Sequence, residues 1–325
     1  MKEKNVDFSI LFPPNMNFAY FDGFEDFPFP NYDSSCNLVA AWWLAESSLI
    51  AYEHPGFIHL AMRLIGANNY KFFSGIITQA FVFTIQNKCV VSFRGTEVKH
   101  INGIADLMSD VSFKMVDFYN KGLVHKGFKL AFEETMSEKV GLWKYVYKIM
   151  EQENIDELHF TGHSLGGAIA TLASAYFENK PHILTTFGSP RVGNYLFGTH
   201  VTKKRFQFIN IGDPVPFLPP NILGVQKENL FTHCGDLLLF DQNRNLSRIS
   251  AEKTSNILNL LKNNAKHTVT NVAKTALTSL LKKPENKSIK NFTHFVRKSN
   301  LDAHSPVIYT INIWNFIART GRKTI

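Results

Sequence analysis

The chain has 325 residues, of which 45% are hydrophobic and 19% are charged. This composition supports a buried core and excludes an intrinsically disordered chain, and the length suits one large α/β domain or two small ones. The three cysteines are odd in number and widely spaced. We therefore expect reduced, structural thiols rather than a disulfide framework or a zinc site.

The net charge of +8 is concentrated in one segment of the chain. Between residues 244 and 298 there are twelve Lys and Arg against two Glu, whereas the rest of the chain has 23 basic and 25 acidic residues. A charge confined to one segment argues against a nucleic-acid-binding protein, so no nucleic-acid partner is expected.

The sequence shows no sign of a membrane-spanning or targeting segment. No apolar run approaches the roughly 18 residues that a spanning helix requires. The apolar stretch near the N-terminus is interrupted by Asp7 and ends at Pro13 and Pro14, unlike a signal peptide. We therefore expect a cytoplasmic protein, or one exported by a route that needs no N-terminal signal.

The first third of the chain begins with an irregular arm, residues 1–36, which is rich in Phe, Pro and Asn. Helical patterns follow over residues 37–54 and 58–67. Two β-rich runs within residues 79–95 flank a short polar stretch, which predicts a hairpin.

The middle of the chain alternates between helical and strand patterns. One long amphipathic helix is predicted over residues 127–154, and a short strand then leads into a small-residue helix that starts near residue 165. Further strands are predicted at residues 182–188 and 205–211. This alternation predicts a single α/β domain over residues 1–325, with a mostly parallel central sheet and helices on both faces. Sites in such folds form at the carboxyl ends of the strands.

The sequence GHSLG places Ser164 between two glycines, where the short strand meets the small-residue helix. The pattern GxSxG is typical of a sharp strand-to-helix turn that exposes a nucleophilic serine, and its glycines avoid collisions with nearby backbone. A second interpretation is a serine that only caps the helix. The motif alone leaves both interpretations open.

Six sequence blocks around this motif share one family pattern. The chain resembles the class 3 lipases, the fungal-type triacylglycerol lipase family of α/β-hydrolases, from about residue 40 to 241 and again near residue 302. The resemblance rests on six blocks: VVSFRGTE (90–97), NGIADL (102–107), VHKGF (124–128), GHSLGGA, TFGSPRVGN (186–194) and INIGDPVPFLPP (209–220).

The resemblance implies four site residues. Ser164 matches the nucleophile of the family, and Asp213 matches the triad acid, although an Asp before Pro214 is also common in turns. Thr96 matches the oxyanion-hole residue, and Leu165 would supply the second N–H of that hole.

The histidine of the triad is harder to assign. In the order Ser, Asp, His, the base follows the acid, as His233, His267, His294 and His304 do. His304 resembles the family histidine that precedes a helix, which Ser305 would cap and Pro306 would start. We expect His304 to be the base, with His233 as the alternative.

Three other polar residues in these blocks are interpreted as structural. His163 precedes the serine and is expected to pack behind it, and His125 is read in the same way. Asp106 matches a family position and is expected to support the oxyanion strand rather than to react.

Two further segments are candidates for contact with lipid. The resemblance implies a lid after Thr96, with Ile101, Ile104 and Leu107 on its apolar face, although a helix that stays shut is an alternative. Residues 245–298 lengthen the family pattern and are predicted to form a basic amphipathic helical insertion. It either meets an anionic membrane surface or packs on the domain.

These patterns together predict a serine carboxylester hydrolase that cleaves acyl esters of glycerides or phospholipids through an acyl-enzyme. This chemistry requires no metal and no cofactor. The alternatives are an esterase or acyltransferase that acts on soluble esters, and an inactive hydrolase fold that binds membranes.

Overall fold

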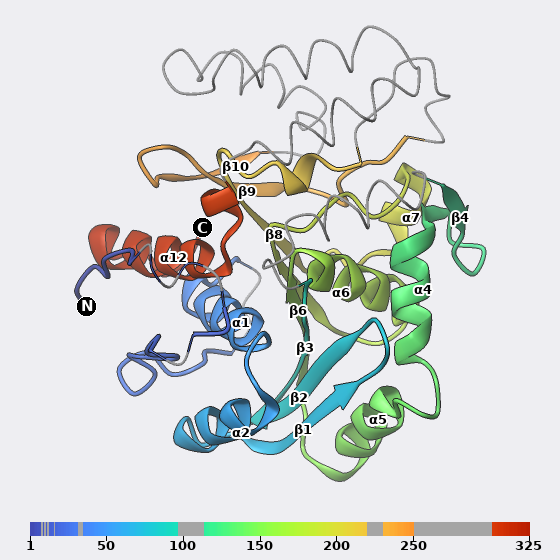
Figure 1. Ribbon diagram of the computed structural model, residues 1–325, viewed down its shortest axis with the longest axis horizontal. Coiled ribbons are helices and arrows are strands. Elements are labelled where there is room, and N and C mark those ends of the chain that lie inside the picture. Colours follow the sequence, from blue (N-terminus) through green and yellow to red (C-terminus); the bar gives the residue numbers. More distant parts are fainter. Residues whose placement is uncertain are drawn as a thin grey trace, which may run out of the picture.

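A twisted central sheet organises the computed structural model (Figure 1). The structure describes residues 1–7, 9, 11, 13–15, 17–31, 35–96, 114–219, 230–249 and 301–325. Within them the sheet has eight strands in the order β1-β2-β3-β6-β7-β8-β9-β10. Their bounds are β1 (Asn68–Ser74), β2 (Gln79–Ile85), β3 (Lys88–Phe93), β6 (Glu157–His163), β7 (Ile183–Phe187), β8 (Arg205–Asn210), β9 (Leu237–Phe240) and β10 (Leu246–Ile249).

The centre of the sheet is parallel and its two edges are antiparallel. Strands β3, β6, β7, β8 and β9 run parallel. Strands β1 and β2 form a hairpin beside β3, and β10 turns back along β9. A separate small ribbon pairs β4 (Met115–Asp117) with β5 (Leu123–His125). The predicted mostly parallel α/β sheet is confirmed, and its carboxyl ends meet at one edge.

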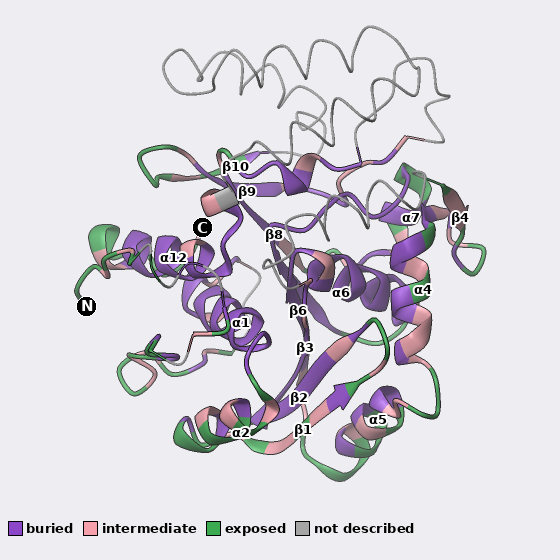
Figure 2. Ribbon diagram, viewed as in Figure 1, coloured by how far each residue is buried: buried purple, intermediate pink, exposed green. Residues whose placement is uncertain are grey.

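Helices cover both faces of the sheet, and each face has its own apolar core (Figures 1 and 2). One core involves α4 (Lys126–Thr135), α5 (Leu142–Gln152) and α6 (Leu165–Tyr176). The other involves α1 (Leu38–Ile50), α2 (Pro55–Leu64) and α12 (Pro306–Thr320). The remaining short elements are α7 (Tyr195–His200), η3 (Val215–Phe217) and η5 (Leu301–His304).

Helix α12 starts and stops where its sequence predicts. The Ser305 hydroxyl accepts the N–H of Val307, and Pro306 occupies the first turn, as expected. Gly321 ends the helix in the left-handed conformation with φ 68°. The helix packs against α1, and its side chains Val307, Ile311 and Trp314 are buried as predicted.

The predicted long helix over residues 127–154 is wrong. The structure has two helices, α4 and α5, with a turn between them. Gly141 lies immediately before α5 with φ 70°, a left-handed conformation that interrupts a right-handed helix. The apolar period continues across the turn because both helices bury a face in the same core.

The N-terminal arm is irregular and is joined to α12 by hydrogen bonds. The Trp314 indole donates to the carbonyl of Lys2, at 2.8 Å. The Lys4 N–H donates to the Asn315 side chain, whose amide donates back to the Lys4 carbonyl. The arm therefore packs on the helix that follows His304.

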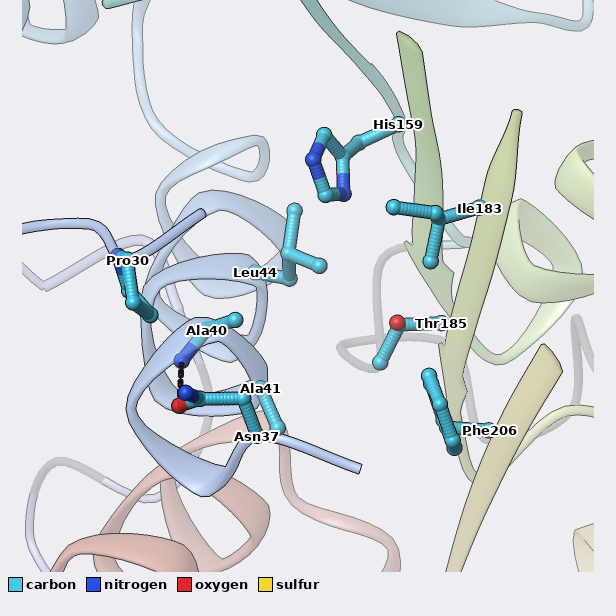
Figure 3. Close-up of a pocket in the computed structure, with 9 residues that line it drawn as sticks. All are labelled: Pro30, Asn37, Ala40, Ala41, Leu44, His159, Ile183, Thr185 and Phe206. Carbon is cyan, nitrogen blue, oxygen red and sulfur yellow. Dashed lines mark hydrogen bonds between the residues drawn. The ribbon is translucent and has the colours of Figure 1, made fainter. Parts of the chain in front are cut away.

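A cavity of about 20 Å³ lies between α1 and the sheet (Figure 3). Its lining includes Leu44, His159, Ile183 and Thr185, and none of the predicted triad residues. A void of this size has room for one water molecule and cannot hold an acyl chain.

The three cysteines are free and buried, as expected. Within the described residues, no helix combines the length and the hydropathy needed to cross a bilayer.

The buried carboxyl of Glu46 makes stability depend on pH. Glu46 is fully buried in α1, where the Trp42 indole donates to one of its oxygens. Burial raises the pKa of this carboxyl to about 7, from 4.5. The folded state therefore holds a proton that the unfolded state releases, and this stability is lost as pH rises from about 4.5 to 7.

We predict that Glu46→Gln removes this loss, because an amide does not ionise. The free energy of unfolding of wild type should fall by roughly 2–3 kcal/mol more than that of the variant across this interval. Urea unfolding at pH 5, 6, 7 and 8 measures the difference. The exposed Glu138→Gln is the control, and equal pH slopes in all three proteins would contradict the prediction.

Candidate active site

Ser164 lies on a strained turn between β6 and α6. Its φ is 57° and its ψ is −127°, a conformation that costs free energy in a residue other than glycine. A Cβ at Gly166 would lie 2.1 Å from the carbonyl oxygen of Phe93. Glycine at this position therefore lets α6 approach the end of β3 and holds the serine in the turn.

The serine does not cap the helix. Its side chain makes no capping hydrogen bond, and its hydroxyl is buried without a partner in the structure. Buried hydroxyls are normally hydrogen-bonded, and an exception indicates a group kept for another purpose. The interpretation of Ser164 as a capping residue is therefore wrong.

Asp213 and His304 form a buried pair at the same edge of the sheet. The His304 Nδ1 lies 2.8 Å from the Asp213 Oδ2, and both side chains are fully buried. Because a carboxylate only accepts, Nδ1 carries the proton when the ring is neutral. Nε2 is then the basic nitrogen, and it has no partner in the structure.

The contacts of residues next to Ser164 place it near the Asp213–His304 pair. The Ser164 N–H donates to the carbonyl of Phe187 at 3.0 Å, and Gly188 follows Phe187. A Cβ on Gly188 would lie 2.9 Å from the Asp213 Oδ2 and 3.1 Å from the His304 Nδ1. The ring centroids of His163 and His304 lie 4.5 Å apart. The three predicted triad residues therefore share one small region.

The acid has two more partners, one of which sequence reasoning missed. Tyr309, on the first turns of α12, donates its hydroxyl to the Asp213 Oδ2 at 2.6 Å. Burial raises the pKa of Tyr309 well above its usual value, so the phenol stays protonated. Val215 donates its N–H to Oδ1, so Asp213 also forms the turn that its position before Pro214 suggested. The only sequence signal for Tyr309 is its place five residues after His304.

His233 lies elsewhere. It follows Thr232, which pairs with Gly193, and burial lowers its pKa well below the usual 6.5. The described bonds of the Asp213 carboxylate go to His304, Tyr309 and Val215. The alternative base is thus not the histidine that the acid orients.

The two predicted oxyanion donors lie at the start of α6 and just after β3. Leu165 is the first residue of α6, and helix geometry leaves its N–H without an intrahelical acceptor. Thr96 lies three residues beyond β3, whose end contacts Gly166. Helix N-termini and free N–H groups stabilise the negative charge that develops on an oxygen atom.

Several predicted residues lie outside the described residues. They are the lid residues Ile101, Ile104 and Leu107, together with Asp106. Most of the predicted insertion, from residue 250 on, also lies outside. Its first residues, Leu246–Ile249, form strand β10. His125 caps α4 through its Nδ1, which accepts the N–H of Gly127, and so has a structural position.

Comparison with known proteins finds one matching family model. Residues 90–223 match the family model Lipase (class 3). A secreted mono- and diacylglycerol lipase 1 from Fusarium solani is 36% identical over 146 residues, which cover 43% of this chain and 41% of the relative. The secreted mono- and diacylglycerol lipase MDL3 of Malassezia globosa is 34% identical over 153 residues, covering 42% and 48%. The matched residues thus span less than half the length of these relatives.

A solved structure shows the same fold. It is described as "a serine protease triad forms the catalytic centre of a triacylglycerol lipase". The sequence identity is 27% and the TM-score is 0.52, and the match covers 65% of this chain and 82% of the solved one.

The comparisons also correct the expected location. The Fusarium and Malassezia relatives are named as secreted proteins, so the prediction of a cytoplasmic protein is wrong. The matched family model, the relatives and the α/β-hydrolase fold agree on one family. Over residues 90–223 the chain is similar to the class 3 lipases.

Proposed function

We propose that the protein is a serine lipase that hydrolyses acyl esters of glycerides. One observation carries the proposal: the buried pair of Asp213 and His304 leaves one basic nitrogen unpartnered, in the region where the Ser164 hydroxyl is also unpartnered. A hydroxyl becomes a useful nucleophile when an oriented base takes its proton. This arrangement supplies the base and its orienting acid.

The proposed reaction proceeds through an acyl-enzyme. The Ser164 oxygen attacks the ester carbonyl while its proton passes to the His304 Nε2. The N–H groups of Thr96 and Leu165 stabilise the oxyanion of the tetrahedral intermediate. When the ester bond breaks, His304 returns the proton to the leaving alcohol. Water then attacks the acyl-enzyme by the same route and releases the fatty acid.

The relatives support glycerides as the substrate class. Two of them are named for mono- and diacylglycerols, and the solved neighbour is named for triacylglycerol. Phospholipids, soluble esters and acyl transfer would use the same residues, but no contact among the described residues favours them. An inactive fold is disfavoured because Ser164, Asp213 and His304 are all present and close together.

Two lipid contacts belong to the proposal as extensions. Ile101, Ile104 and Leu107 would form the apolar face of a lid, and residues 245–298 would meet an anionic surface through their lysines. Both rest on the sequence pattern, because amphipathic basic helices bind interfaces through apolar and cationic side chains together.

We predict that His304→Ala lowers kcat for p-nitrophenyl butyrate at least about a thousandfold, because the variant lacks the imidazole that Asp213 orients. Because His233 makes no described contact with the acid, His233→Ala should retain most activity. Labelling with a fluorophosphonate, mapped by mass spectrometry, should modify Ser164 in wild type and not in Ser164→Ala. An active His304→Ala protein would reject the proposed triad.

We predict that Tyr309→Phe lowers kcat about tenfold with little change in KM, because the acid loses one of two donors at Oδ2. The control is Tyr145→Phe, which removes a tyrosine hydroxyl on α5 that donates to the Asn69 carbonyl. Steady-state kinetics compare the two. Equal kcat values for both variants would show that the Tyr309 bond does not orient the acid.

We predict that replacing five lysines of the insertion by Gln, at positions 262, 266, 274, 282 and 283, weakens binding to vesicles containing phosphatidylserine. Binding to neutral phosphatidylcholine vesicles should not change. The matched control replaces Lys144 and Lys148, which are exposed on α5. Co-sedimentation measures binding, and unchanged binding to the anionic vesicles would exclude membrane contact through these lysines.

A further inference from the structure

His163, the residue before Ser164, has a hydrogen bond on each ring nitrogen. Its Nε2 lies 2.6 Å from the main-chain carbonyl oxygen of His304, and its Nδ1 lies 2.8 Å from the hydroxyl of Tyr52. The side chain is fully buried, and burial lowers its pKa well below 6.5. The ring is therefore neutral at neutral pH.

These contacts fix the tautomer of His163. A carbonyl oxygen only accepts, so Nε2 must carry the proton and donate it to His304. In a neutral ring Nδ1 is then an acceptor, and Tyr52 donates its hydroxyl to it. The contact with the carbonyl oxygen therefore excludes the other neutral tautomer of His163, and it sets the direction of both hydrogen bonds.

Tyr52 extends the network to Gly95, which lies between β3 and Thr96. It follows α1 and is buried, and its hydroxyl lies close to the main chain of Gly95. A Cβ on Gly95 would lie 2.1 Å from this hydroxyl and 2.6 Å from the carbonyl oxygen of His163. Only glycine allows the strand to approach both residues so closely.

The network therefore joins three parts of the proposed site. Gly95 precedes the oxyanion residue Thr96, His163 precedes Ser164, and the last acceptor is the main chain of His304 itself. Each contact is to a main-chain atom or to a buried side chain, so the rotamer freedom is small. Chains of buried hydrogen bonds of this kind fix geometry when every member is satisfied.

We propose that Tyr52 and His163 are positioning residues, which hold the main chain of His304 and of the segment Gly95–Thr96 in place around Ser164. The inference rests on the proposed hydrolase function and adds two residues to it. Neither residue touches the reacting atoms; both act through His304 and Thr96. Misplacement of a catalytic group by a fraction of an ångström is sufficient to slow the chemical step.

The proposed positioning role also requires His163 to be neutral. The His163 and His304 rings are 4.5 Å apart, and His304 becomes an imidazolium when it takes the serine proton. A second cation at this distance in a buried site would oppose that charge. A positioning group here must donate a hydrogen bond without carrying charge, and a buried imidazole with a tyrosine on its other nitrogen does so.

The test compares four variants with wild type in the full chain. Tyr52→Phe removes the donor to His163, His163→Gln keeps an N–H and an acceptor, and His163→Leu removes both. The fourth combines Tyr52→Phe with His163→Leu. Tyr70→Phe is the control, since it removes a tyrosine hydroxyl that donates to the Pro55 carbonyl. Kinetics with p-nitrophenyl butyrate, the rate of fluorophosphonate labelling and the Tm are measured for each.

We expect Tyr52→Phe to lower kcat and the labelling rate about tenfold, with KM and Tm close to those of the control. His163→Gln should retain more kcat than His163→Leu. Tyr52→Phe should cost nothing further in the His163→Leu background, because the tyrosine acts through the histidine. Additive losses, or a Tyr52→Phe enzyme as active as Tyr70→Phe, would overturn the inference. A wild-type protein that neither hydrolyses the ester nor is labelled would instead overturn the proposed function.

Discussion

The buried hydrogen bond between Asp213 and His304 is the interaction on which the site depends. Both side chains are fully buried, and a buried carboxylate without partners is costly. The fold supplies those partners from three places: the His304 ring, the Val215 N–H and the Tyr309 hydroxyl. His304 and Tyr309 both belong to the C-terminal segment, whose helix α12 packs on α1.

The position of α12 in turn depends on the N-terminal arm. Trp314 and Asn315 are bonded to the main chain of Lys2 and Lys4, and the Ser305 hydroxyl donates to the carbonyl of Leu11. Ser305 is also the cap of α12 and the residue after His304. The arm lacks regular structure, yet its main chain is hydrogen-bonded to the cap and to the middle of α12. An irregular arm can thus be part of the scaffold of a site.

The sequence predicted the three candidate triad residues, which the structure places in one region, but it gave no signal for the side chains packed around them. Ser164, Asp213 and His304 each lie in a short motif whose local pattern specifies a strand end or a helix start, so the sheet edge brings them together. Tyr52 and Tyr309 come from helical segments with no such signal, and they reach the site only through tertiary packing. The break between α4 and α5 was missed for a related reason. The apolar period continues through it, and a single glycine, Gly141, decides the local conformation.

Among the described residues, the hydrogen bonds around Ser164 leave free the two atoms that the proposed chemistry requires. Tyr52, His163, Asp213 and Tyr309 all have described partners for their polar side-chain atoms. In the same cluster the Ser164 hydroxyl and the His304 Nε2 are buried and unpartnered. Saturating the surrounding groups removes competing partners for the base, so that its remaining nitrogen is available to the serine and then to the leaving alcohol.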